Sequence, residues 1–472
     1  MNILFAASEA KPYAASGGLA DVVGSLPKEI CGKGHDCRIV MPLYKSIGEE
    51  MRSEMTFLKN ITVDVSWRKQ YCGIYTAVKN GVTYYFIDNE YYFLRDGLYG
   101  FYDDCERFVF FSRAVLEMIR YIDFKPDVIN ANDWQTALIS VYYNIYYKYQ
   151  QGYDQIKNVF TIHNIEYQGR YGREVLNEVM GIPLYHANIL EYDGYINMMK
   201  GAIEASDMVT TVSRSYAWEI LDPWYSHGMD RILATKQNKL KGILNGIDVV
   251  KNNPETDDKI PANYSCKNLS GKKKCKKALI SELNLADDDA PIIGIITRFV
   301  GHKGIDLIRC VFDEMVNMGI KFAILGSGEK IYEDFFKEMA YRYPDRVSAT
   351  IGFVPELSGK IYAGADMFLM PSQSEPCGLA QMFAMRYGTI PIVRETGGLR
   401  DTVRDNGGEN GNGFTFKTYN ANDMLDAVKR AVAVYEDPKE WNELINRAMK
   451  CDYSWSASAE EYIKMYENLI SE

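Results

Sequence analysis

Short apolar runs alternate with amphipathic stretches along most of the chain. The first run, Ile3–Ala7, is followed by a glycine-containing loop and then by apolar residues at helical spacing between Leu19 and Ile30. A buried strand, a glycine loop and a helix in this order are typical of the opening of a nucleotide-binding α/β unit. The pattern recurs, and further strands are predicted at Arg38–Met41, Tyr84–Ile87, Val128–Asn130, Val159–Thr161 and Val209–Val212.

The pattern is interrupted between residues 251 and 291 and then starts again. The polar stretch holds a lysine-rich cluster at 272–277 and three consecutive aspartates at 287–289. Charge runs of this kind are typical of a solvated face. Apolar runs resume after the interruption, at Pro291–Ile296, Lys321–Leu325, Phe368–Met370 and Ile390–Val393.

Strand-like runs separated by helical patterns, such as Glu106–Ile119, favour parallel sheets with helices on both faces. We therefore expect an α/β chain of two doubly wound, Rossmann-like domains at residues 1–245 and 246–450. Ligands of such sheets bind at the carboxyl ends of the strands, so two domains facing each other predict an interdomain cleft.

Composition narrows the range of partners. The 472 residues are 47% apolar and 25% charged, which is ordinary for a globular protein, and the net charge is −10. An acidic chain is a poor general binder of nucleic acid, and no apolar run reaches the length of a membrane span.

The amino-terminal sequence and the cysteines indicate a cytoplasmic protein. The first residues lack the basic segment and the long apolar core of a secretion signal. The nine cysteines include no CxxC pair, and we expect them to be reduced. The glycosylation-like sequons at Asn60, Asn263 and Asn268 are then chance matches.

Two cations follow the first strand of the second domain. Arg298 and Lys303 are five residues apart in a loop that leaves the carboxyl end of that strand. An arginine fork and a lysine point charge so placed can converge on a pyrophosphate. The alternative interpretation is two unrelated surface cations.

A second loop, residues 371–379, follows the strand at Phe368–Met370 and leads into a helical pattern. The helix start offers backbone N–H groups and the positive end of a dipole to an anion. Glu375, just before it, has two interpretations: a hydrogen-bond acceptor for sugar hydroxyls, or a helix N-cap.

His163 and Asp133 each follow a predicted strand of the first domain. At such ends they face the ligand region, although a structural role is the alternative for each. The sequence contains no HExxH, GxxxxGK[ST] or GxSxG motif, so zinc hydrolases, P-loop kinases and serine hydrolases have no support.

Taken together, these motifs resemble those of the bacterial glycogen synthase and starch synthase family, retaining glucosyltransferases of glycosyltransferase family 5. The resemblance covers essentially the whole chain. It is most specific in the segments 17–23, 161–164, 242–248, 374–379, 387–389 and 394–402.

The resemblance implies a GT-B fold and transfer of glucose from ADP-glucose to the 4-hydroxyl at the non-reducing end of an α-1,4-glucan. Configuration is retained, and neither a metal nor another cofactor is required. It also implies a terminal crossover helix, residues 451–472, that packs on the first domain. No feature of the sequence indicates an oligomeric state.

The resemblance assigns a role to individual residues. Five are implied to be catalytic: Asp133, His163, Arg298, Lys303 and Glu375. Residues implied to contact the donor are Gly17, Gly18, Asn164, Asn245, Phe353, Cys377, Gly378 and Leu379, with Phe353 stacking on the base. Tyr99 is implied to hold the acceptor.

Two positions depart from the family pattern. The glycine loop is usually introduced by lysine, and here that position is Ala15; His302 stands where glutamine is common. A missing cation leaves the choice between ADP-glucose and UDP-glucose open. It also leaves open a GT-B transferase with another acceptor and a catalytically weak glucan-binding homologue.

Overall fold

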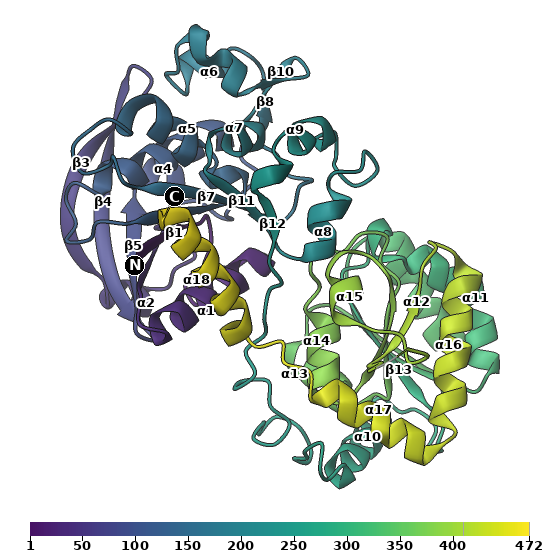
Figure 1. Cartoon of the computed structure of the whole chain (residues 1–472). Helices are drawn as coiled ribbons and strands as arrows, with labels where there is room; N and C mark the ends of the chain where they lie inside the picture. The colour runs from purple at the N-terminus through teal and green to yellow at the C-terminus, as the bar shows by residue number, and fades with distance from the viewer. Residues whose placement is uncertain (409, 472) are drawn as a thin grey trace. The chain divides into compact units, whose positions relative to one another are not determined.

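The structure is a computed structural model that describes residues 1–408 and 410–471. The chain forms two compact units, each shown in Figure 1. Unit 1 comprises Met1–Ile243 together with the last helix, α18 (Trp455–Ser471), and unit 2 comprises Leu244–Ser454.

The main sheet of unit 1 has the strand order β12-β11-β7-β6-β1-β2-β5-β4-β3. It is parallel from β12 to β5, whereas β4 and β3 are antiparallel additions. The strands are β1 (Asn2–Ala6), β2 (Asp36–Pro42), β3 (Thr56–Val65), β4 (Arg68–Lys79), β5 (Val82–Asp88), β6 (Val128–Asn132), β7 (Lys157–Ile162), β11 (Met208–Thr211) and β12 (Leu240–Gly242).

The remaining elements of unit 1 are helices and a small antiparallel sheet. That sheet consists of β8 (Arg170–Tyr171), β9 (Glu191–Tyr192) and β10 (Tyr195–Asn197). The helices besides α18 are α1 (Gly18–Gly32), α2 (Glu49–Ser53), α3 (Glu90–Phe93), α4 (Asp104–Met118), α5 (Leu138–Tyr142), α6 (Val175–Glu178), α7 (Met198–Ala205), α8 (Arg214–Glu219) and α9 (Asp230–Thr235).

Helix α18 returns the chain to unit 1 and packs beside α1. Its apolar stripe, which includes Tyr462 and Tyr466, is buried. The Tyr466 hydroxyl donates to Asn130 Oδ1 (2.8 Å) in the sheet, so an interaction between positions 336 residues apart fixes the helix. A stripe of this width requires a partner surface, and α1 and the sheet supply it.

Unit 2 holds an all-parallel sheet in the order β15-β14-β13-β16-β17-β18. Its strands are β13 (Ile292–Ile296), β14 (Lys321–Gly326), β15 (Val347–Ile351), β16 (Met367–Met370), β17 (Ile390–Arg394) and β18 (Phe414–Phe416). Its helices are α10 (Ser270–Glu282), α11 (Ile305–Asn317), α12 (Lys330–Arg342), α13 (Pro355–Gly364), α14 (Ala380–Arg386), α15 (Gly397–Thr402), α16 (Ala421–Tyr435) and α17 (Pro438–Met449).

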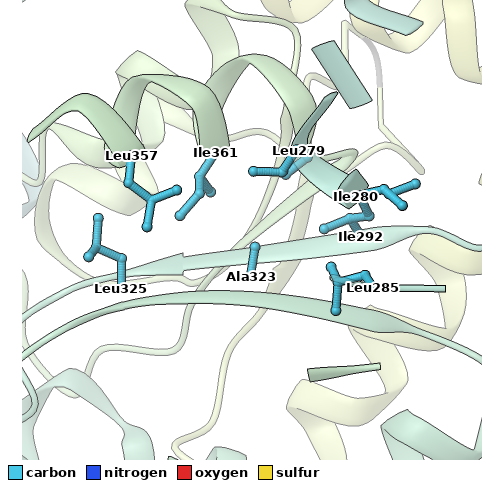
Figure 2. Close-up of a cluster of buried hydrophobic side chains, with 9 residues drawn as sticks. Leu279, Ile280, Leu285, Ile292, Ala323, Leu325, Leu357 and Ile361 are labelled. Carbon is cyan, nitrogen blue, oxygen red and sulfur yellow. The ribbon is translucent and has the colours of Figure 1, made fainter. Parts of the chain in front are cut away.

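One face of the unit 2 sheet is covered by α10 and α13. Figure 2 shows Leu279 and Ile280 from α10 and Ile361 from α13 above the strands that carry Ile292 and Ala323. These side chains are at most 4% exposed. Burial of such aliphatic groups contributes about 25 cal/mol per Å² and is what holds α10 in place despite its many lysines.

In both sheets the strand order reverses next to the first strand. The reversal lies between β1 and β6 in unit 1, and between β13 and β16 in unit 2. Doubly wound sheets bind ligands at the carboxyl ends of the strands at this position. The loops after these four strands are therefore the places where a site is expected in each unit.

The predicted α/β class is confirmed, with two corrections. The antiparallel β3–β4 pair was not predicted from the sequence, because its strands are partly exposed and lack a continuous apolar run. The lysine cluster is not simply a solvated face: Lys272 is buried, and its Nζ lies 2.9–3.1 Å from four acceptors (Ala363 O, Ala365 O, Tyr387 O and Thr389 Oγ1).

Candidate active site

Lys303 and Glu375 form an ion pair at the strand reversal of unit 2. The distance from Lys303 Nζ to Glu375 Oε2 is 2.7 Å, and Ser372 Oγ donates to the same oxygen (3.0 Å). Glu375 is buried, and the N-cap of α14 is Leu379, so the carboxylate does not cap that helix. The pair holds the ammonium in place and leaves Glu375 Oε1 able to accept a hydrogen bond.

Arg298 has a different environment in the same region. It is exposed, and within the described ranges its side chain makes no hydrogen bond or ion pair. An arginine side chain without a partner in the protein is available to an anion. Arg298 and Lys303 both lie in the segment that follows β13. The structure thus brings Lys303 and Glu375 into contact and places Arg298 at the same end of β13.

The loop at Cys377, Gly378 and Leu379 passes very close to the start of α15. Gly378 has a φ of 69°, which glycine adopts readily. A Cβ at Gly398 would lie 1.9 Å from the Cys377 carbonyl oxygen, and the Gly398 N–H donates to the Glu375 carbonyl oxygen (3.1 Å). Glycine at 398 is therefore required for this approach. The helix itself begins at Ala380, three residues after Cys377.

Two other predicted donor contacts lie in unit 2. Phe353 follows β15 and is 91% exposed, so it does not pack in the core. Asn245 is buried, and its Oδ1 has no hydrogen-bond partner in the described part of the chain. An orphaned buried oxygen is rare and marks a place where a ligand or water can donate.

His163 lies at the carboxyl end of β7 in unit 1. Asn132 Nδ2 donates to two carbonyl oxygens, so Asn132 Oδ1 accepts from His163 Nε2 (2.9 Å). Burial lowers the pKa of His163 to about 3, so the ring is neutral at pH 7. Its proton is on Nε2, and Nδ1 is an acceptor.

Asp133 is held in an unusual backbone conformation. Its φ is 57° and its ψ is 178°, a region that is essentially restricted to glycine and costs about 1–3 kcal/mol. The strained turn aims Asp133 Oδ1 at the backbone N–H of His163 (2.7 Å) and, more weakly, of Asn164 (3.5 Å). Burial raises the pKa of Asp133 to about 7, despite these hydrogen bonds.

Glu9, which the sequence analysis did not single out, anchors the glycine loop. It is buried after β1, and its carboxylate accepts from the Ser16 backbone N–H. Burial raises the pKa of Glu9, and hydrogen bonds from Ser16 and Gly17 oppose that shift. Its position three residues after the end of β1, a buried strand, is the sequence signal that could have identified it. Ala15 and Gly17 are exposed in this loop, and Gly18 is exposed as the first residue of α1.

Tyr99 is half-buried and contacts Ser8, the residue before Glu9. Its hydroxyl forms a hydrogen bond with Ser8 Oγ (2.7 Å), and burial raises its pKa well above the usual range. Nearby charges that contribute to this shift include Glu9 and Asp133. Unit 1 therefore gathers Tyr99, Asp133, His163 and Asn164, and unit 2 gathers Arg298, Lys303, Glu375 and the 377–379 loop.

Metal-binding and membrane-spanning features were sought in residues 1–408 and 410–471. No group of three or more His, Cys, Asp or Glu side chains there is placed to hold a metal ion. No helix there is long and apolar enough to cross a membrane.

Comparison with known proteins gives matches over the whole chain. Residues 2–235 match the family described as the starch synthase catalytic domain, and residues 276–450 match the glycosyl transferases group 1. Glycogen synthase of Clostridium botulinum (strain Alaska E43 / Type E3) is 48% identical and covers 99% of both chains. Glycogen synthase of Bacillus cereus (strain ATCC 10987 / NRS 248) is also 48% identical and covers 100% of both.

Solved structures agree with these matches. The catalytic domain of starch synthase IV from Arabidopsis thaliana, bound to ADP and acarbose, has a TM-score of 0.90 at 34% identity and covers 100% of this chain and 99% of its own. Sucrose-phosphate synthase from Thermosynechococcus elongatus, at 16% identity and a TM-score of 0.61, covers the same shares and has a similar fold.

The fold and these matches define a glycosyltransferase of the GT-B type. The chain belongs to the glycogen synthase family. The family, the fold class and the enzyme class expected from the sequence are confirmed.

Proposed function

We propose that this enzyme transfers glucose from ADP-glucose to the 4-hydroxyl at the non-reducing end of an α-1,4-glucan, with retention of configuration. The contact between Lys303 and Glu375 carries the proposal, because it fixes a cation and a sugar-hydroxyl acceptor together at the strand reversal of unit 2. The 48% identity to glycogen synthases over the full length supports the same reaction.

Breaking the bond between the anomeric carbon and the leaving oxygen puts negative charge on the diphosphate. Arg298 and Lys303 are proposed to stabilise that charge, together with backbone N–H groups of the 377–379 loop. Groups fixed in advance do this at little reorganisation cost. Glu375 holds Lys303 and, through Oε1, accepts from a glucose hydroxyl. Phe353 is proposed to stack on the base, and Asn245 to contact the donor.

The sugar ring develops positive charge in the same step. Groups of unit 1 are proposed to orient it: the neutral His163 accepts a hydrogen bond from a glucose hydroxyl at Nδ1, and Asp133 fixes the backbone of His163 and Asn164. A neutral imidazole orients the ring without adding a cation beside a developing cation. Gly17 and Gly18 are proposed to line the donor, and Tyr99 to contact the acceptor.

The test measures incorporation of [14C]-glucose into glycogen from ADP-glucose and from UDP-glucose in parallel. We expect transfer from ADP-glucose without added metal and with chelator present. Transfer from UDP-glucose alone would replace the donor assignment, and Ala15 is the position that would then need explanation. Glycogen binding without transfer from either donor would contradict the proposed reaction.

A further inference from the structure

A cavity of about 710 Å³ lies within unit 2, away from the groups discussed so far. It is lined by α10, by α17, by the end of α16 and by the segments that precede β13, β14 and β16; α10 and α17 lie at the same end of unit 2 in Figure 1. Its size is in the usual range for small-ligand sites. We refer to it as the amino-end cavity, because it lies where these strands begin.

The cavity is separated from the proposed donor groups by the length of the sheet. Arg298 and Lys303 follow the carboxyl end of β13, whereas Ala290 and Pro291 line the cavity at its amino end. Five residues of strand span roughly 17 Å. An occupant of the amino-end cavity therefore would not occupy the place of the donor diphosphate.

The two charge runs of the sequence meet in this cavity, and part of each is neutralised internally. Lys276 pairs with Asp366 (2.8 Å), and Asp288 pairs with Lys321 (2.9 Å) and Arg346 (2.8 Å). The charges of these groups, like that of Lys272, are already paired within the protein. They are therefore not available to bind a ligand in the cavity.

The remaining charged groups are exposed and carry both signs. Lys273, Lys277, Asp287, Asp289 and Glu436 line the cavity, and in the described ranges their side chains make no hydrogen bond or ion pair. Two cations and three carboxylates leave a small negative excess, which disfavours an anion such as phosphate. A neutral, hydroxyl-rich ligand suits both signs, because a hydroxyl donates to a carboxylate and accepts from an ammonium group.

Trp441 adds an apolar wall with one polar atom. Its side chain is only 6% exposed and packs edge-on against Tyr435, with ring centroids 5.2 Å apart. No hydrogen bond is made by its indole N–H within the described residues, and the indole nitrogen is not one of their buried unpaired atoms, so this donor is open to solvent. An apolar wall that carries one solvent-facing donor suits the apolar face and the hydroxyl edge of a sugar.

We propose that the amino-end cavity binds a glucosyl segment of an α-1,4-glucan. The identity of the ligand rests on the proposed function, which makes this polymer both acceptor and product. Lys273, Lys277, Asp287 and Asp289 bond to its hydroxyls, and Trp441 donates to one of them. A chain held here keeps the other ends of the same polymer near the enzyme without blocking the donor.

The test uses the full chain and measures binding of maltoheptaose by calorimetry and of glycogen by affinity electrophoresis, both without nucleotide-sugar. The variants are Asp287→Ala with Asp289→Ala, Lys277→Ala, and Trp441→Phe, which keeps a ring and removes the N–H. Matched controls are Asp334→Ala and Lys429→Ala, exposed residues outside the cavity. We expect glycogen affinity to fall about 10-fold in the double aspartate variant, as for loss of one charge-assisted hydrogen bond, and to stay unchanged in the controls.

Kinetics separate this site from the transfer site. The KM for glycogen should rise in the cavity variants, while kcat and the KM for ADP-glucose stay at the parent values. Unchanged glycogen affinity in all cavity variants would overturn the inference and leave the proposed function intact. Binding lost in these variants from a parent chain that transfers no glucose would uphold the site and contradict the proposed reaction.

Discussion

The two units build their polar clusters on the same kind of sheet by different means. In unit 1 the groups are neutral or buried: His163 is uncharged, the pKa of Asp133 is raised, and a glycine-like backbone conformation aims the Asp133 carboxyl. In unit 2 they are charged and held by an ion pair, with Arg298 exposed beside them. In the reaction proposed above, unit 1 faces the uncharged sugar ring and unit 2 faces the diphosphate, and the difference between the clusters is the one that this proposal requires.

Loss of the neutral acceptor in unit 1 should have the largest effect. His163→Ala should reduce kcat by about 10²-fold or more, as for removal of a preorganised polar group, with little change in nucleotide affinity. The measurement is steady-state kinetics together with ADP binding. His186→Ala, a partly exposed histidine on the same unit, is the control. Parent-level turnover in His163→Ala would return His163 to a structural role.

Loss of either cation in unit 2 should be nearly as severe. Negative charge on the diphosphate grows as the bond breaks, so Arg298→Ala and Lys303→Ala should each lower kcat by about 10- to 150-fold, equivalent to 1.5–3 kcal/mol. The exposed Arg342→Ala serves as control. Normal kinetics in Arg298→Ala would refute its role in leaving-group stabilisation.

Phe353 tests whether unit 2 also binds the base. Stacking of an aromatic ring on a base is worth about 1–3 kcal/mol, so Phe353→Ala should raise the KM for ADP-glucose at least about fivefold while kcat changes little. Because Phe353 is 91% exposed, thermal stability should be unaffected. A fall in kcat alone would contradict the stacking assignment.

The raised pKa of Asp133 makes unit 1 sensitive to pH. Asp133 has a pKa of about 7 when folded and 3.8 ordinarily, so between these values the folded chain retains a proton that the unfolded chain has lost. Stability therefore falls as pH rises through this window, by at most about 1.4 kcal/mol per pH unit. In Asp133→Asn, which keeps an acceptor for the His163 N–H, this contribution should disappear.

The check is urea unfolding of the parent and of Asp133→Asn at pH 5 and pH 8. The variant should gain stability relative to the parent at pH 8, and less at pH 5. Equal differences at both pH values would show that Asp133 is ionised throughout.

The smallest effect on kinetics is expected from adding a cation to unit 1, which would make its cluster more like the charged cluster of unit 2. Ala15→Lys would place a cation on the exposed glycine loop of unit 1. An exposed charge contributes at most about 1 kcal/mol, so the KM for ADP-glucose should fall by no more than about fivefold. An unchanged KM would indicate that another group already compensates for the missing lysine.

Much of this architecture could be predicted because parallel strands buried on both faces read as continuous apolar runs. Ile292–Ile296 is such a run, and the cations after it could be located from the strand alone. The β3–β4 pair has no such run. Many of its positions are exposed, so its strands could not be recognised from the sequence pattern. Candidate site residues could be located because they follow predicted strands, but the roles assigned to them remain proposals.

Other features depended on distant parts of the chain. The four acceptors of Lys272 come from residues about 90 or more positions away, so no local pattern distinguishes it from the exposed Lys273. The φ of Asp133 and the proton position on His163 follow from tertiary contacts with Asn132 and the sheet. Sequence patterns indicate where a polar group lies along the chain and say little about its protonation.

The return of the chain to unit 1 has a consequence for synthesis on the ribosome. Unit 2 ends at Ser454, whereas α18, which covers α1 and bonds to Asn130, emerges only afterwards. Domains generally fold as their residues appear. Unit 2 can thus complete its core while α1, synthesised hundreds of residues earlier, is still uncovered by α18. The unit whose synthesis begins first is therefore the last to complete its fold.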